Sequence, residues 1–134
     1  MTQKKLLDSY ALLAYLNREE SFRKVQEALY EAQISGHPLL MNEINVGETY
    51  YILYRKRDRE KADFFLDTVL VGLPIRVLPN SFEDVVSSAR LKAQYPLSFA
   101  DCFAASTARR ENAIIMTGDP EFENLEHMVE IEWL

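Results

Sequence analysis

The sequence predicts an α/β protein whose core is a mostly parallel sheet. Short apolar runs alternate along the chain with longer segments of helical spacing, as in successive βαβ units. The run AIIM at residues 113–116 is apolar throughout, as in a strand that is buried on both faces. The length of 134 residues, with 48% hydrophobic and 27% charged residues, is that of one globular domain.

Five apolar runs are expected to form the strands. The first ends at Asp8, and the fourth ends just before the Thr-Gly-Asp-Pro segment that starts at Thr117. The last run alternates apolar and polar residues, as an edge strand does. The expected strands are residues 5–8, 37–42, 75–79, 113–116 and 128–134.

The segments between these runs have the patterns of helices. Phe22, Val25 and Leu29 recur at the spacing of one helix face, for example. Gly36 follows that segment, and glycine is the residue that most often ends a helix. The expected helices are residues 9–17, 21–33, 45–56, 59–71, 81–95 and 97–112.

Three helix starts carry residues that are typical of caps. Asn45 is expected to cap the helix that begins near it. Ser98 and Asp101 have the spacing of a capping box. Asp119 followed by Pro120 is typical of a helix start, with the carboxylate as cap and proline at the first helical position.

Four acids fall near the points where strands and helices meet. Asp8 ends the first strand, and Glu48 lies in the first turn of the helix after the second. Asp101 lies at the start of the helix before the fourth strand, and Asp119 follows that strand. Ligands of open α/β sheets bind outside the carboxyl ends of the strands, so we expect these four side chains to converge there.

Converging carboxylates indicate a bound cation. A cap alone would be served equally well by serine, threonine or asparagine, without the repulsion between acids. A divalent ion removes that repulsion and keeps the acids ionised. An all-oxygen ligand set favours Mg²⁺, with Mn²⁺ as a possible substitute, over zinc.

Other chemistries are poorly supported. Cys102 is the only cysteine, which excludes a disulfide framework and a thiolate metal site and is compatible with a reducing compartment. The apolar N-terminal stretch is interrupted by Asp8 and has no signal-peptide cleavage pattern, so a cytoplasmic location is expected. The net charge of −6 argues against nonspecific nucleic-acid binding, although residues 54–61 (YRKRDREK) form a local basic cluster.

Three segments together resemble the PIN-domain ribonucleases, and in particular the VapC-type toxins of prokaryotic toxin-antitoxin pairs. They are LLDSYALLAYL, NEINVGETYYILYR and LSFADCFAASTARRENAIIMTGDPEF. The resemblance covers nearly the whole chain, with the motifs in the family's order. It implies one PIN-like nuclease domain over residues 1–134, with a five-stranded sheet in the order 3-2-1-4-5 flanked by helices.

The resemblance also implies roles for individual residues. Glu43 lies just ahead of Glu48 and could share or replace its role, but the NVGE segment fits the family better. The implied catalytic and metal-binding residues are Asp8, Glu48, Asp101 and Asp119. The implied supporting residues are Ser9 and Thr117, and Asn45 is expected to support the site by capping the turn that presents Glu48.

The function that this family implies is Mg²⁺- or Mn²⁺-dependent hydrolysis of RNA phosphodiesters by a metal-activated water. The products carry a 5′ phosphate and a 3′ hydroxyl. The protein is expected to be a homodimer and the toxin of a type II toxin-antitoxin system, neutralised by a small antitoxin protein. The RNA sequence that is cut, and the number of metal ions, do not follow from the sequence.

Two alternatives stay open. One is a catalytically silent PIN-like module that only binds other molecules, although all four acids are present. The other is a receiver-type phosphoacceptor domain, which also binds Mg²⁺ on a five-stranded α/β fold. A receiver needs an acidic pair after the first strand and a lysine near the end of the fifth, and LLDSY and EIEWL supply neither.

Overall fold

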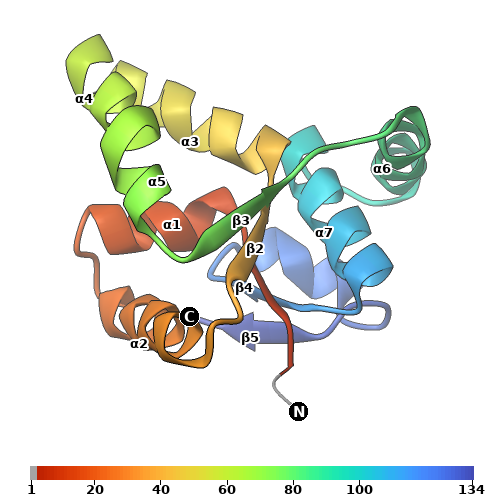
Figure 1. The fold of residues 1–134 in the computed structure, drawn as a ribbon. Helices are drawn as coiled ribbons and strands as arrows, with labels where there is room; N and C mark the ends of the chain where they lie inside the picture. Colours follow the sequence, from red (N-terminus) through yellow and green to blue (C-terminus); the bar gives the residue numbers. More distant parts are fainter. Residues whose placement is uncertain (1–2) are drawn as a thin grey trace.

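The computed structural model describes residues 3–134, which form a five-stranded parallel sheet between layers of helices (Figure 1). Every neighbouring pair of strands is parallel, so the sheet expected to be mostly parallel is fully parallel, and its order is β3-β2-β1-β4-β5. The strands are β1 (Lys5–Leu7), β2 (Leu39–Asn42), β3 (Ile75–Leu78), β4 (Ile114–Thr117) and β5 (Ile131–Trp133).

Helices cover both faces of this sheet. In Figure 1, α1 and α2 lie on one side, and α6 and α7 lie on the other. The expected helix at 59–71 is a run of α4, a π-helical turn (Phe65–Val69) and α5, and a 3₁₀ helix (Pro120–Leu125) follows β4. The helices are α1 (Ser9–Leu16), α2 (Phe22–Ser35), α3 (Glu43–Lys56), α4 (Arg59–Phe64), α5 (Leu70–Gly72), α6 (Phe82–Gln94) and α7 (Phe99–Glu111).

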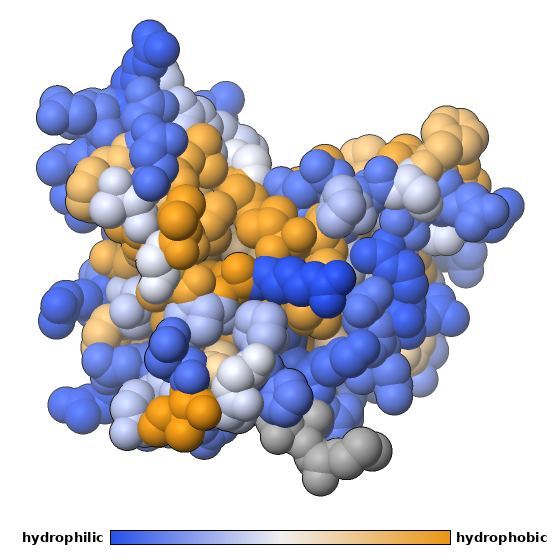
Figure 2. All heavy atoms as spheres, in the orientation of Figure 1, coloured by the Kyte–Doolittle hydropathy of each residue, from blue (hydrophilic) through white to orange (hydrophobic). Residues whose placement is uncertain are grey.

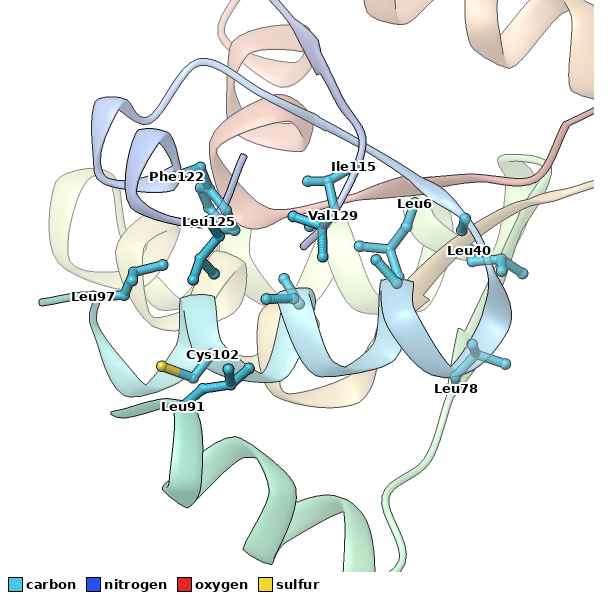
Figure 3. Close-up of a cluster of buried hydrophobic side chains, with 14 residues drawn as sticks. Leu6, Leu40, Leu78, Leu91, Leu97, Cys102, Ile115, Phe122, Leu125 and Val129 are labelled. Carbon is cyan, nitrogen blue, oxygen red and sulfur yellow. The ribbon is translucent and has the colours of Figure 1, made fainter. Parts of the chain in front are cut away.

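Alternate strand residues pack against opposite helical layers, which explains why the strands are apolar throughout. Leu6 of β1 and Ile115 of β4 belong to the cluster that packs around α7 and includes Cys102 (Figure 3). The next residues along the two strands, Leu7 and Met116, belong to the cluster formed with α1 and α2. The buried sheet therefore holds the carboxyl ends of β1 and β4 in fixed positions.

Helix boundaries follow from local chemistry. Gly36 ends α2 in the left-handed conformation, at φ 75°, as the sequence predicts. Among the helices in residues 3–134, none is long and apolar enough to cross a membrane.

The cap of α3 differs from the prediction. The helix begins at Glu43, and the carboxamide oxygen of Asn42 accepts the Ile44 N–H at 2.8 Å. Asn45 is therefore inside the first turn and is not the cap. Its side chain is fully buried and donates instead to the backbone oxygen of Ala100 at 3.1 Å, which ties α3 to α7. Asparagine is a favourable N-cap residue at either position, so the sequence does not distinguish Asn42 from Asn45. Asn42 is the cap because β2 ends there and α3 begins at the next residue.

Asn42→Ala is expected to destabilise the protein by about 2–4 kcal/mol, because it removes a helix cap and breaks a buried hydrogen-bond network. Besides capping α3, the Asn42 amide donates at 2.7 Å to both Asn80 and Thr107. Urea denaturation measures the change, with Gln33→Ala on the exposed surface of α2 as the control. Equal unfolding free energies for the two variants would contradict this role.

Candidate functional site

The site lies where the strand order reverses. The chain adds β2 and β3 on one side of β1 and then crosses to place β4 on the other side. The carboxyl ends of β1 and β4 therefore border the crevice in which ligands of open α/β sheets bind. Asp8 directly follows β1, and Gly118 and Asp119 directly follow β4.

Asp8 is held by both neighbouring elements. One of its carboxylate oxygens caps α1 by accepting the Ala11 N–H at 2.8 Å, and the other accepts the hydroxyl of Thr117. The Thr117 oxygen in turn accepts the Asp119 N–H at 3.0 Å. This chain of bonds joins the ends of β1 and β4, and it leaves Asp8 only 1% exposed.

Glu48, and not Glu43, is bound to the Asp8 segment. The hydroxyl of Ser9 donates to the Glu48 carboxylate, which connects α1 to α3. The Glu43 carboxylate accepts the backbone N–H of Asn80 at 2.6 Å and so is committed to the end of β3. The two acids are five residues apart, so they project from different sides of the helix. The two candidates therefore make different contacts, Glu48 with the start of α1 and Glu43 with the segment after β3.

The helix that carries Asp101 begins with half of the predicted capping box. The Ser98 hydroxyl accepts the Asp101 N–H at 3.2 Å, but the Ser98 N–H donates to the carboxylate of Glu121. At the start of α6, by contrast, Ser81 and Asp84 make both bonds of the box. The Asp101 carboxylate thus turns away from its own helix start and toward the other acids.

Asp101, Asp119 and Glu121 form a compact acidic cluster. One carboxylate oxygen from each of the three lies within 4.8 Å of the others. Sequence reasoning missed Glu121, whose only signal is its position two residues after Asp119, in the first turn of the 3₁₀ helix. Asp8 and Glu48 are outside this closest group, and the bonds of Thr117 and Ser9 connect them to it.

The acids influence each other electrostatically. Burial raises the pKa of Asp8 to about 7, and the charges of Asp119 and Glu48 add to this rise, while bonds from Thr117 and Ala11 oppose it. Burial also raises the pKa of Asp101 to about 8, with further increases from the charges of Asp119 and Asp8. The pKa of Asp8 is thus influenced by the charges of Glu48 and Asp119, and that of Asp101 by the charges of Asp8 and Asp119.

The family is shown by comparison with known proteins. The family model described as "PIN domain" matches residues 5–128. The chain belongs to the PIN domain family. A search of curated proteins gave no match.

Solved structures with the same fold are distant in sequence. A chain of the VapBC2 complex from Rickettsia felis superposes with a TM-score of 0.73 and 17% identity, over 97% of this chain and 98% of that one. A chain of DNA-bound VapBC from Salmonella typhimurium gives 0.72 and 17%, over 98% of each. VapC20 from Mycobacterium tuberculosis gives 0.71 and 14%, over 90% of this chain and 93% of that one. At such identities the likeness establishes the fold.

The donor set of this PIN domain fits a hard divalent cation. The clustered groups are carboxylates, and Mg²⁺ and Mn²⁺ bind oxygen ligands. Two carboxyl groups, on Asp8 and Asp101, have pKa values near or above neutrality in the protein alone, and a nearby dication reverses such shifts. The buried carboxamide oxygen of Asn45, beside the start of α7, has no hydrogen-bond partner in residues 3–134, so it can accept from water there.

Proposed function

We propose that the protein is a divalent-metal-dependent endoribonuclease and the toxin of a type II toxin-antitoxin pair, with residues 1–134 as its nuclease domain. The observation that carries the proposal is the acidic cluster of Asp101, Asp119 and Glu121 at the switch point of a PIN domain, to which charge interactions and hydrogen bonds link Asp8 and Glu48. Clustered acids whose charges raise the pKa values of Asp8 and Asp101 suit the binding of a cation, whereas helix capping alone needs no such cluster.

In this proposal Asp8, Glu48, Asp101 and Asp119 hold the ion, and Glu121 is a further candidate ligand. Mg²⁺ or Mn²⁺, when bound, supplies charge neutralisation at the phosphoryl group and a water that is easier to deprotonate. Ser9 orients Glu48, and Thr117 fixes Asp8 relative to Asp119. Asn45 holds α3 against α7 and so maintains the separation of Glu48 and Asp101.

RNA is the proposed substrate because of the fold and of one exposed arginine on α3. VapC20, which shares the fold, is described as a toxin that cleaves the sarcin-ricin loop. The side chain of Arg55 lies over the ring of Tyr51, 5.1 Å from its centroid, and both are exposed on α3. Arg55 is two turns, or about 10 Å, beyond Glu48 on this helix, a distance that suits a phosphate next to the reaction site.

The proposed partners are an antitoxin protein and a second copy of the chain, in the cytoplasm. Two of the similar structures are VapBC complexes bound to DNA. Hydrophobic side chains gather beside α5 and over β3 in Figure 2. Val71 of α5 is 77% exposed and Val77 of β3 is 39% exposed. Such a patch is typical of a surface that binds protein. Light scattering of the purified protein tests the dimer.

A cleavage assay tests the enzyme. The purified protein is incubated with cellular RNA and Mg²⁺ or Mn²⁺, and the cut ends are sequenced. We expect discrete cuts that leave 5′ phosphates and 3′ hydroxyls, and we expect chelation of the metal to abolish them. Expression in bacteria should arrest growth, and the substitutions that abolish cleavage should relieve the arrest. Stable RNA in the presence of both metals would exclude the enzyme.

Metal binding is expected to raise the midpoint of thermal unfolding, because an ion that binds only the folded state stabilises it. At a concentration of about 100 times the dissociation constant the gain is about 2.7 kcal/mol. A melting titration with Mg²⁺ and Mn²⁺ measures this, with Na⁺ at equal ionic strength as the control. An unchanged midpoint would instead support a silent PIN-like module, which is the second candidate function.

A further inference from the structure

The ring of Tyr10 lies against Gly118, in the turn that presents Asp119. A Cβ atom added at Gly118 would be 2.3 Å from Cε1 of Tyr10, 2.7 Å from Cζ and 3.0 Å from the hydroxyl oxygen. Real Cβ atoms do not approach so closely. The one glycine with positive φ in residues 3–134 is Gly36, so the backbone conformation does not require glycine at 118. The absence of a side chain there serves the close approach of the tyrosine ring.

Tyr10 is exposed although its chain neighbours are buried. Asp8, Ser9 and Ala11 are all at most 7% exposed, whereas Tyr10 is 43% exposed. The ring thus lies against Gly118 on one side and is partly open to solvent. A half-exposed ring at this position borders the acidic site.

A second exposed ring occurs at the other acidic helix start. Phe99 is two residues before Asp101 on α7 and is 45% exposed. It packs edge-on against Phe103, with the ring centroids 5.0 Å apart, so it too is fixed by a neighbour. Helices α1 and α7 both begin at the end of the sheet that carries the acids. Two partly exposed aromatic rings therefore lie next to the acidic cluster.

We propose that Tyr10 is a stacking platform for an unpaired base next to the scissile phosphate. This rests on the proposed nuclease function. Aromatic side chains bind unpaired bases by stacking, without need of positive charge. Bases inside an RNA duplex are stacked on each other and do not present their faces to a protein. Base stacking therefore supplies affinity at a site whose own charge repels phosphate.

Kinetics of Tyr10 variants test the proposal. The probe is a short, fluorescently labelled single-stranded RNA that the wild-type protein cleaves, and the same RNA annealed to its complement. Tyr10→Leu is expected to raise KM for the single strand by about tenfold or more, with little change in kcat. Tyr10→Phe keeps the ring and should behave as the wild type does. The duplex should be cut slowly by every variant.

Tyr30→Leu is the matched control. Tyr30 is 66% exposed on α2 and lines a hollow with Lys4 and Pro38, at the opposite edge of the sheet. Its loss should leave KM unchanged. The metal-dependent rise of the melting midpoint should be the same in all Tyr10 variants, because Tyr10 only supports the substrate.

Gly118→Ala provides an independent test of the position of the Tyr10 ring. In the wild-type background it should raise KM, because the new Cβ displaces the Tyr10 ring. In the Tyr10→Leu background it should have little further effect on KM, because the ring is no longer there to be displaced. If the KM of Tyr10→Leu equals that of Tyr30→Leu while the wild type cleaves RNA, the stacking role is wrong and the proposed nuclease function is retained. If the wild type cleaves no RNA, the proposed function fails and takes this inference with it.

Discussion

Asp101→Asn is expected to reduce RNA cleavage by about 10³-fold or more, because the loss of several kcal/mol of charge stabilisation at the phosphoryl group acts directly on the rate. The amide is a weaker ligand for a hard cation than the carboxylate, so the metal-induced rise in the melting midpoint should shrink as well. Asp8→Asn should have the same effects. The fold should survive both changes, since a neutral group at either position removes repulsion between buried acids.

Glu43→Gln is the matched control for these variants. Glu43 is exposed at the start of the same helix that carries Glu48, but its carboxylate is bonded to Asn80. Its cleavage rate should equal that of the wild type. Wild-type cleavage by Asp101→Asn would refute the assignment of the acids, and loss of cleavage in Glu43→Gln would move the role of Glu48 to its neighbour.

Without divalent ions, the protein should lose stability as the pH rises from about 4 to about 8. The pKa of Asp8 rises from 3.8 to about 7 on folding, and that of Asp101 rises from 3.8 to about 8. The folded state therefore binds more protons than the unfolded state in this range, and the free energy of unfolding falls with pH. The stabilisation is fully present below the unfolded pKa and is lost as the pH passes the folded values. The expected loss is on the order of a few kcal/mol.

Melting in chelator at about pH 5 and at about pH 8.5 measures this loss, which should lower the midpoint by roughly 10 °C. The double variant Asp8→Asn, Asp101→Asn lacks the two titrating groups and should show a much smaller difference. Saturating Mg²⁺ should remove most of the loss in the wild type, because the ion favours the ionised acids. An equal pH dependence in the double variant would mean that other groups cause it.

Much of the fold is local in origin and could be predicted. The strand and helix positions follow from the apolar spacing, and Gly36 and the Asp119-Pro120 pair mark their boundaries as expected. The predicted helix caps at Asn45 and at Ser98–Asp101 were wrong or half right, because in each case a second residue can make the same hydrogen bond. Asn42 and Asn45 have equal chemistry, and Ser98 has two acids, Asp101 and Glu121, that can bond its N–H. Sequence spacing does not distinguish partners that are brought together by packing.

The sequence alone determined the α/β class, the positions of the strands and the presence of acids at their carboxyl ends, because these depend on side-chain periodicity and on the order of residues along the chain. The tertiary structure decided which of those acids meet. It added Glu121 to Asp101 and Asp119, bound Glu48 to Ser9 while committing Glu43 to Asn80, and placed Tyr10 on Gly118. The bond between Asp8 and Thr117 joins residues 109 positions apart, and the crossover from β3 to β4 through α6 and α7 brings the ends of β1 and β4 together.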